Sequence, residues 1–424
     1  MLYKEVKTLQ NNIVEDFIND NNLFAIFKSP VNILFTDNFA ANIKKMKDIF
    51  RQNSLCGNIF FSCKCNKSFA FLKFAVDCGC GIEVSSKFEL NDALKYTDKI
   101  VASGPGKDYE YLKLAIENGV VISVDDIEEL KVIAKLGKFA RVLLRCSSNW
   151  IGIPSRFGIQ KDEIDDCLRL LKGNDINLIG FSFHINNYDL NDRIMMIKEI
   201  LALVKNKKLN IKVIDVGGGI PVNYCSEEEF INFKLNNKKE FYFANKEFNS
   251  FYPYFNDLAE NKFLNTFLQE IRDDLGEIEI YIEPGRVLVN NCGISVYKVE
   301  YVKETQDGNI VVVNSNINNL SEQWFNSDYL IEPKLYSKYK IKQKDYYASV
   351  AGNLCLENDM VTWRRIKFSQ KPASGDLLVY YNTAGYQMDS NESMFHKIPL
   401  VEKYVVYKKD NTYQIKKDKD YDRK

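Results

Sequence analysis

Eight apolar, β-prone runs recur between residues 58 and 282, and segments with helical patterning separate most of them. The runs are NIFFSCK (58–64), CGIEV (80–84), KIVAS (99–103), VVISV (120–124), ARVLLRC (140–146), LIGFSFH (178–184), IKVIDV (211–216) and IEIYI (278–282). Eight strands alternating with helices over about 225 residues match a (β/α)8 barrel. An open, doubly wound sheet is the alternative, but it would have fewer strands and a glycine-rich loop after the first one. That loop is missing, so the sequence predicts an α/β protein built on a TIM barrel.

The segments between these runs are expected to be helices. They cover residues 68–78, 87–96, 108–118, 126–136, 161–172 and 189–206. Ser86, Asp108, Asp125 and Asp189 stand at or just before four of the helix starts, where N-cap residues are found.

The pattern changes after the last of the eight runs. Strand-like segments such as NIVVVNS, DLLVYY and EKYVVYKK follow one another with turns between them and little helical sequence, which predicts a second, mostly antiparallel β-domain. We expect residues 38–288 to form the barrel, and residues 1–37 and 289–424 to form the β-domain. The strand-like NILFTD (32–37), which precedes the barrel, is expected to become a strand of the β-domain. The aromatic-rich segment 225–257 interrupts the barrel pattern and is expected to contribute to the site or to a subunit contact.

Composition narrows the classes of partner. The 424 residues include 57 Lys and Arg against 57 Asp and Glu, so no basic excess predicts binding to nucleic acid or to a membrane surface. The N-terminus lacks the apolar core of a signal peptide, and no run of 18 or more apolar residues occurs. Ten cysteines without zinc-knuckle spacing and only two histidines predict free thiols in a reducing cytoplasm and no metal centre.

In a TIM barrel, chemistry is found where the C-terminal ends of the strands converge. Polar residues and glycines gather at these ends in the sequence. In order they are Lys64, Glu83, Ser103-Gly104, Asp125, Arg145, His184, Gly217-Gly218-Gly219 and Glu283-Pro284-Gly285-Arg286. Such a set predicts a functional site at the mouth of the barrel.

The glycine triplet Gly217–Gly219 follows the seventh strand. Adjacent glycines permit positive φ and let backbone N–H groups approach an anion closely. A tight turn alone would need only one or two glycines. Because many barrels bind phosphate after strands seven and eight, the triplet predicts a phosphate site.

Three further strand-end residues have both an ordinary and a chemical interpretation. Lys64 could be a lysine that extends into solvent, His184 a core histidine, and Glu283 a partner of Arg286 in a structural ion pair. Together with a phosphate site, however, they supply an amine that forms an imine, a ring that stacks on a flat cofactor, and a carboxylate for a pyridinium nitrogen. Pyridoxal phosphate (PLP) requires this combination, which makes it the predicted cofactor.

These residues stand in motifs that resemble the fold-type III pyridoxal-phosphate decarboxylases, the family of ornithine, arginine, diaminopimelate and carboxynorspermidine decarboxylases. The resemblance covers essentially the whole chain. FFSCKCN is similar to the family's Y-A-V-K-A-N, GIEVSSKFEL to its second-strand segment with Glu83 in place of Asp, SRFGI to S-K-F-G, and FHINN to H-V-G-S. GGGIP and EPGR match as they stand, while GNLCLENDMV and NTAGYQM resemble G-P-x-C-[DE]-x-x-D and the A-G-A-Y segment.

The resemblance implies an alanine racemase-like arrangement of barrel and β-domain, and a homodimer in which the β-domain of one chain completes the partner's active site. Lys64 would carry the cofactor as a Schiff base, His184 would stack on its ring, and Glu283 would hold the pyridine nitrogen protonated. Cys355 of the partner subunit would protonate the intermediate. The other implied cofactor-binding residues are Glu83, Gly217, Gly218, Gly219, Gly285, Arg286 and Tyr386, and the implied substrate-binding residues are Glu357 and Asp359.

The sequence departs from the family pattern at the substrate end. Diamine-type members carry an acidic residue directly after the cysteine, where this chain has Leu356, with Glu357 one residue later and Asp359 in the final acidic place. Ornithine or lysine is therefore a less favoured substrate. The Gly-Ser after the family histidine is replaced by Asn186-Asn187, which alters a phosphate contact.

The expected reaction is decarboxylation of an amino acid through an external aldimine and a quinonoid. The substrate would be diaminopimelate-like, polyamine-precursor-like, or an unusual amino acid or conjugate. A racemase or another α-carbon enzyme is the first alternative, which Glu283 and Cys355 oppose. A non-catalytic decarboxylase-like regulator is the second, and such proteins lose the cofactor ligands that this chain retains.

Overall fold

The computed structural model describes residues 5–9, 11–21, 23–248, 251–320, 331–339 and 344–423. The chain divides into two compact units. The barrel unit comprises Ala40–Pro221, Glu260–Leu288 and Asp422–Lys424. The sheet unit comprises Met1–Phe39, Val222–Ala259 and Val289–Tyr421. Across the described residues, every helix is too short or too polar to span a membrane.

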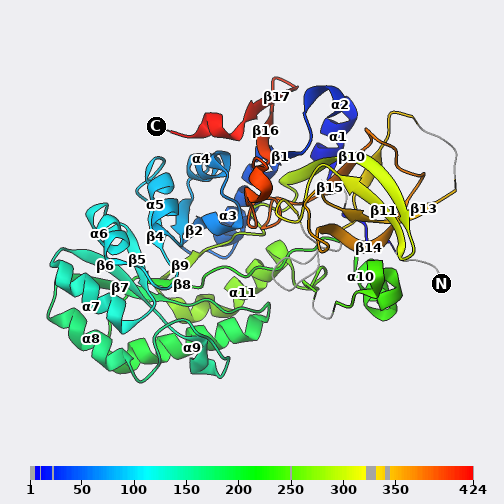
Figure 1. Cartoon of the computed structure of the whole chain (residues 1–424). Helices are drawn as coiled ribbons and strands as arrows, with labels where there is room; N and C mark the ends of the chain where they lie inside the picture. Colours follow the sequence, from blue (N-terminus) through cyan, green and yellow to red (C-terminus); the bar gives the residue numbers. More distant parts are fainter. Residues whose placement is uncertain are drawn as a thin grey trace. The chain divides into compact units, whose positions relative to one another are not determined.

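The barrel unit contains a closed ring of eight parallel strands (Figure 1). They are β2 (Gly57–Ser62), β3 (Gly81–Val84), β4 (Ile100–Ala102), β5 (Val121–Val124), β6 (Ala140–Arg145), β7 (Ile176–Ser182), β8 (Val213–Asp215) and β9 (Glu279–Ile282). Each strand pairs with the next along the chain, and β9 pairs back with β2. The predicted TIM barrel is confirmed, with every strand at its expected place in the sequence.

Helices lie on the outer side of this ring (Figure 1). They are α3 (Thr36–Gln52), α4 (Phe69–Asp77), α5 (Lys87–Leu94), α6 (Tyr109–Glu117), α7 (Ile127–Leu136), α8 (Ile164–Lys172), α9 (Leu190–Lys207) and α11 (Glu260–Leu275), with short 3-10 turns at Cys63–Cys65 and Ser148–Ile151. Ser86, Asp108 and Asp189 cap α5, α6 and α9 as predicted, each accepting a hydrogen bond from a backbone N–H of the first turn. The expectation for Asp125 is wrong, because the adjacent Asp126 caps α7 and Asp125 binds an arginine instead.

Large apolar side chains fill the inside of the barrel. Phe60, Val101, Val121, Leu143 and Val213 form a buried cluster, against which Ile179 and Tyr281 pack. The rings of Phe60 and Tyr281 lie 4.9 Å apart. Because the interior is a packed core, the polar strand-end residues are held at the rim of a rigid ring.

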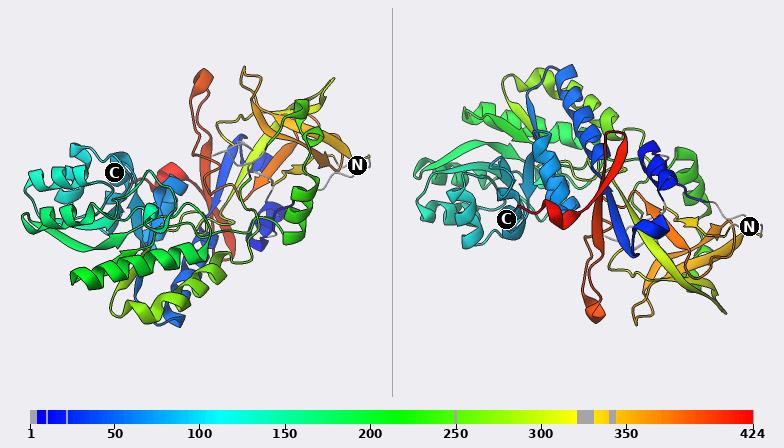
Figure 2. Two further views of the ribbon diagram at one scale, coloured as in Figure 1. Left: turned by 90° about the horizontal axis from the view of Figure 1, so that it is seen from below. Right: turned by 90° about the horizontal axis from the view of Figure 1, so that it is seen from above.

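The sheet unit is built on a nine-stranded, mostly antiparallel sheet, as predicted. Its strands are β1 (Val31–Phe35), β10 (Gly293–Thr305), β11 (Gly308–Val313), β12 (Lys334–Tyr336), β13 (Tyr346–Ala351), β14 (Met360–Phe368), β15 (Leu377–Tyr381), β16 (Glu402–Lys409) and β17 (Thr412–Lys417), and its helices include α1 (Asn12–Asp20) and α2 (Leu23–Ile26). The N-terminal strand β1 lies between β10 and β16, so the segment before the barrel joins the C-terminal sheet (Figure 2). All five residues of β1 are buried, which explains why all of them except Asn32 are apolar.

The aromatic-rich segment 225–257 belongs to the sheet unit. It contains α10 (Glu227–Asn236), which begins with a capping box at Ser226 and Glu229. Beyond this helix, Tyr242 is buried in a cluster with Met360 and Trp363 of β14. Packing within this unit therefore accounts for part of the aromatic content, and a role in the site or in a subunit contact stays a prediction.

Candidate active site

Lys64 and Glu83 form an ion pair at the end of two neighbouring strands. Lys64 lies in the 3-10 turn Cys63–Cys65 that follows β2, and Glu83 lies near the end of β3. Their Nζ and Oε2 atoms are 3.4 Å apart. The Lys64 side chain is 42% exposed, whereas that of Glu83 is completely buried. The Lys64 amine is therefore accessible to a small molecule, and the buried Glu83 carboxylate holds it in place.

Three serine hydroxyls satisfy the buried carboxylate of Glu83. Ser85 donates to Oε1 at 2.9 Å, Ser103 donates to the same oxygen, and Ser62 donates to Oε2. Burial alone would raise the pKa of Glu83, but the Lys64 ammonium and the three hydroxyls outweigh burial and lower the pKa. Glu83 is thus a permanent negative charge beside Lys64.

The three glycines after β8 are each required by a different neighbour. A Cβ on Gly217 would lie 2.7 Å from His184 Nδ1, and one on Gly218 would lie 2.6 Å from the backbone oxygen of Glu283. A Cβ on Gly219 would lie 2.3 Å from Arg193 Nη2. Gly217 and Gly219 also have φ of 66° and 78°, which favour glycine. The triplet is therefore the junction between β7, β8 and β9.

Only part of the triplet's backbone is available to an anion. The Gly217 N–H donates to Asp215 Oδ1 at 2.9 Å, and the Gly218 N–H donates to His184 Nδ1 at 3.2 Å. Within the described chain, the N–H groups of Gly219 and Ile220 have no hydrogen-bond partner. The predicted phosphate site is thus narrowed to the second half of the glycine loop.

His184 lies two residues beyond β7. Since Nδ1 accepts a hydrogen bond from Gly218, the imidazole is neutral with its proton on Nε2. Burial, followed by the positive charges of Lys64, Arg145 and Arg193, lowers the pKa of His184 to about 3. The ring therefore offers a flat, uncharged face at physiological pH.

Glu283 follows β9 and is 8% exposed, next to the fully buried Asp215 at the end of β8. Burial first, then the nearby carboxylates of Asp215 and Glu83, raise the pKa of Glu283 well above its ordinary value. Burial likewise raises the pKa of Asp215 to about 6, and Asp215 Oδ2 has no hydrogen-bond partner in the described chain. Burial and the proximity of a second acid therefore favour the protonated form of Glu283.

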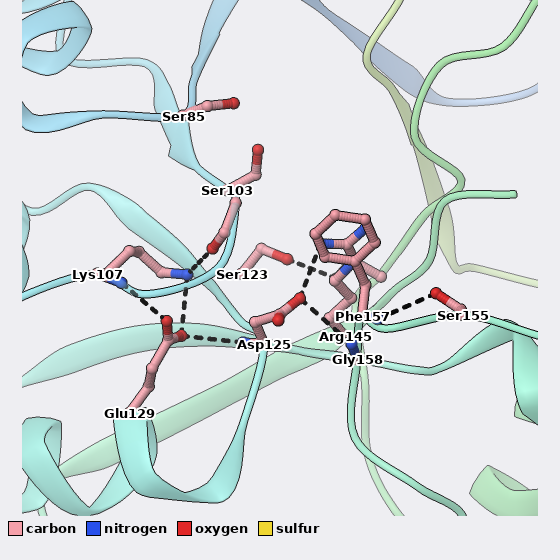
Figure 3. A network of polar contacts seen from close by, with 12 residues as sticks. Ser85, Ser103, Lys107, Ser123, Asp125, Glu129, Arg145, Ser155, Phe157 and Gly158 are labelled. Carbon is pink, nitrogen blue, oxygen red and sulfur yellow. Dashed lines mark hydrogen bonds and ion pairs between the residues drawn. The ribbon is translucent and has the colours of Figure 1, made fainter. Parts of the chain in front are cut away.

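A second charge network lies at the ends of β4 to β6 (Figure 3). The buried Lys107 ammonium lies 2.9 Å from Glu129, and Arg145 lies 2.7 Å from Asp125. Asp125 also accepts a hydrogen bond from the Gly158 N–H at 3.3 Å. The network therefore fixes the loop Ser155–Gly158, which carries the Ser-Arg-Phe-Gly motif, at the rim of the barrel.

The same loop contacts the arginine of that network directly. The Arg145 guanidinium lies 4.5 Å from the centre of the Phe157 ring, a cation–π contact. Asp125 and Arg145 are thus brought into the site region as the strand-end pattern predicted, as parts of its wall.

Four of the remaining predicted site residues lie in the sheet unit, whereas Gly285 and Arg286 follow β9 in the barrel unit. Cys355 and Glu357 are exposed, on the turn that connects β13 to β14. Asp359 is buried and accepts hydrogen bonds from the backbone N–H groups of Leu354 at 2.6 Å and Ile317 at 2.9 Å. Tyr386 is half-buried with φ of 68°. Their roles at the cofactor and substrate stay predictions.

Two residues of the site, and one contact, were not anticipated from the sequence. Asp215 could have been found, because it is an acidic residue near the end of an apolar run, two positions before the glycine triplet. Ser103 was recognised at a strand end, but its hydrogen bond to Glu83 depends on the neighbouring strand. Arg193 lies in an ordinary helical pattern and left no signal.

The residues at the barrel rim fit pyridoxal phosphate. They supply an accessible amine at Lys64, unpartnered backbone N–H groups at Gly219 and Ile220 for a phosphate, a neutral ring at His184 and a pair of buried carboxyl groups at Asp215 and Glu283. Among the described residues, no group of three or more His, Cys, Asp or Glu side chains is placed to hold a metal ion. All ten cysteines are present as thiols.

Comparison with known proteins agrees with this geometry. Residues 37–290 match the family model for the pyridoxal-dependent decarboxylase, pyridoxal binding domain. An uncharacterized protein from Sinorhizobium fredii, y4yA, is 30% identical over 89% of this chain and 88% of its own length. The 2-[(L-alanin-3-ylcarbamoyl)methyl]-2-hydroxybutanedioate decarboxylase of Staphylococcus aureus is 25% identical over 75% of this chain and 80% of its own.

A solved structure has the same fold. It is the diaminopimelate decarboxylase of M. jannaschii in complex with L-lysine, which superposes with a TM-score of 0.76 at 20% identity, covering 95% of this chain and 92% of that one. Family model, relatives and fold agree with the cofactor chemistry of the barrel rim. The chain belongs to the fold-type III pyridoxal-phosphate-dependent decarboxylases, and its cofactor is pyridoxal 5'-phosphate.

Proposed function

We propose that this protein releases CO2 from an α-amino acid that is longer or bulkier than lysine. Suitable substrates are diaminopimelate-like amino acids, polyamine precursors or amino-acid conjugates. The names of two relatives support the first and the last of these classes, since one acts on diaminopimelate and another on an alanine derivative joined to a hydroxylated polyacid. The single observation that carries the proposal is the surface formed by the Cys355 turn.

That turn presents a thiol, an apolar side chain and one carboxylate to the outside. Cys355, Leu356 and Glu357 are exposed, whereas the carboxylate of Asp359 is turned inward onto the backbone of the loop. A short diamine substrate would need a carboxylate directly after the cysteine, and Leu356 cannot supply it. A longer substrate places an apolar spacer against Leu356 and a hydrogen-bonding or cationic end at Glu357.

The barrel residues have distinct tasks in this proposal. When bound, pyridoxal phosphate supplies an electron sink for the charge that departing CO2 leaves on the α-carbon. Lys64 would hold the cofactor covalently through its aldehyde until the substrate amine takes its place. His184 would cover one face of the ring without adding a positive charge, and Glu283 would hold a proton at the pyridine nitrogen.

Cys355 is proposed to act in the partner's site. The thiol is exposed on its own chain, which supports a homodimer in which it donates a proton to the α-carbon after CO2 leaves. A racemase is less well supported, because a carboxylate at Glu283 keeps the pyridine nitrogen protonated and favours loss of CO2.

The test is CO2 release by the cofactor-loaded protein from diaminopimelate, carboxynorspermidine, ornithine, arginine, lysine and the substrate of the S. aureus relative. We expect turnover on a long substrate and little on ornithine or lysine. Leu356→Asp should shift the preference toward ornithine or lysine by about tenfold in kcat/KM, since one charged contact is worth about 1–3 kcal/mol. Equal or greater turnover on ornithine by the unmodified protein would refute the proposed length preference.

Cys355→Ala is expected to lower kcat by roughly 10² to 10⁴ while cofactor binding is retained. Cys56→Ala is the matched control, because Cys56 is also exposed but precedes β2 at the opposite end of the barrel. An unchanged rate for Cys355→Ala would remove the proton-donor assignment.

A further inference from the structure

A buried arginine on α9 joins the two loops that flank the candidate phosphate site. Arg193 is 2% exposed. Its Nη2 donates to the backbone oxygens of Asn187 at 2.7 Å, Ile185 at 3.2 Å and Gly219 at 3.2 Å. Its Nη1 donates to the backbone oxygen of Asp189 at 2.9 Å. The guanidinium therefore connects the loop after His184 with the glycine loop after β8.

The guanidinium of Arg193 forms its hydrogen bonds with carbonyl groups. In the described part of the chain, no carboxylate lies within ion-pair distance of it, and its guanidinium lies 5.5 Å from the centre of the Phe263 ring. Burial lowers the pKa of Arg193 to about 10 although the more distant charges of Asp192 and Asp189 act in the opposite direction, so the group is still a cation at neutral pH. A buried cation without a direct ionic partner is costly, which raises the question of what anion it serves.

Each peptide group whose carbonyl oxygen accepts a hydrogen bond from Arg193 also carries an N–H group. In a trans peptide the N–H points opposite to the C=O. Since Arg193 draws in the oxygens of Ile185 and Gly219, the N–H groups of Asn186 and Ile220 point away from the guanidinium. Neither of these N–H groups has a hydrogen-bond partner among the described residues.

The glycine loop is also shaped by this contact. A Cβ on Gly219 would lie 2.3 Å from Arg193 Nη2, so the loop approaches the guanidinium as closely as glycine permits. The side-chain oxygen of Asn187, in the Asn186-Asn187 pair that replaces the family's Gly-Ser, is 3.4 Å from Nη1. The unusual pair and the arginine thus form one unit.

We propose that Arg193 is a positioning residue for the cofactor's phosphate. It sets the two loops so that the N–H groups of Asn186, Gly219 and Ile220 are available to a dianion, and its charge, transmitted through polarised peptide groups, stabilises that dianion. Arg193 does not contact the phosphate itself. This proposal depends on the cofactor and is independent of which amino acid is decarboxylated.

The test compares two ligands of the apo-protein, pyridoxal 5'-phosphate and pyridoxal, which lacks the phosphate. Their dissociation constants are measured by absorbance titration in unmodified protein, Arg193→Lys and Arg193→Met. We expect the preference for the phosphorylated ligand to fall by about 10- to 100-fold in Arg193→Met, and by less in Arg193→Lys, which keeps the charge but loses the planar fork. Arg272→Met, at a half-exposed position on α11, is the control and should leave the ratio unchanged.

A purely structural arginine gives a different result. Equal losses of affinity for both ligands, or no loss for either, would overturn the proposal. If Arg193→Met does not fold, as judged by circular dichroism, Arg193→Lys and Gly219→Ala decide the question by the same ratio. Gly219→Ala displaces the guanidinium from the glycine loop, so it too should reduce the preference for the phosphorylated ligand.

Discussion

Two buried carboxyl groups flank the strand that leads to Lys64, and their pKa values are shifted from the ordinary value of a glutamate in opposite directions. β3 carries Glu83 and β9 leads to Glu283, and β2 pairs with both strands. Glu83 is fully buried and Glu283 is 8% exposed. Yet the pKa of Glu83 is lowered and that of Glu283 is raised. Burial alone therefore does not decide the charge of an acid in this barrel.

The neighbours of each carboxyl explain the difference. Glu83 receives hydrogen bonds from three serines and faces the Lys64 ammonium, which together outweigh its burial. Glu283 lies beside another acid, Asp215, so ionising both would place two like charges together. One side of Lys64 is thus a fixed negative charge, and the other side is an acid whose protonated form is favoured.

The largest effect is expected from Lys64→Ala, which removes the cation that the two acids share. We expect turnover to fall by on the order of 10³-fold or more, because the covalent attachment of the cofactor is lost. Borohydride reduction followed by peptide mapping should label Lys64 in unmodified protein and in Lys73→Ala, a control on the outer helix α4. A label on another lysine would exclude the proposed attachment.

Glu283→Gln tests the acid with the raised pKa in this comparison. Since glutamine cannot counterbalance a protonated ring nitrogen, we expect kcat to fall by about 10²- to 10³-fold with little change in unfolding free energy. Steady-state CO2 release and thermal unfolding measure the two quantities. A loss of stability without a loss of kcat would reverse the roles assigned to the two acids.

Glu83→Gln should mainly affect stability, in contrast to Glu283→Gln, which should mainly affect kcat. The substitution removes a charge that accepts three hydroxyl hydrogen bonds, so we expect the free energy of unfolding to fall by about 1–3 kcal/mol. Because the folded pKa of Glu83 is lowered, its contribution is present above the unfolded pKa of about 4.3 and is lost as the pH falls through the folded value. Urea unfolding at pH 7 and at acidic pH should show that this difference shrinks on acidification.

Asp215→Asn should give the smallest and most specific change. Asparagine keeps the acceptor for the Gly217 N–H but removes the like charge, so the pKa of Glu283 should fall. The infrared band of the protonated carboxyl group, followed against pH in the apo-protein, measures the shift, and Glu283→Gln identifies the band. A rise in the pKa would show that Asp215 does not act by like-charge repulsion.

The success of the sequence interpretation followed from local patterns. Apolar runs located all eight barrel strands, and capping residues located three helix starts. The misplaced cap at Asp125 shows the limit, because two adjacent aspartates compete for one helix start. Asp126 caps α7, and a partner on β6 engages Asp125. Such a choice depends on a contact twenty residues away in the chain.

The sequence by itself determined the order of the elements and which side chains reach the barrel mouth, because strand and helix periods are encoded locally. It also supplied the motifs that identify the cofactor. Only the tertiary structure decided which acid is charged, which glycine N–H groups are open to an anion, and where the cation of Arg193 lies. These properties depend on burial and on hydrogen-bond partners from other strands, since the electrostatic environment of a group is set by neighbours in space.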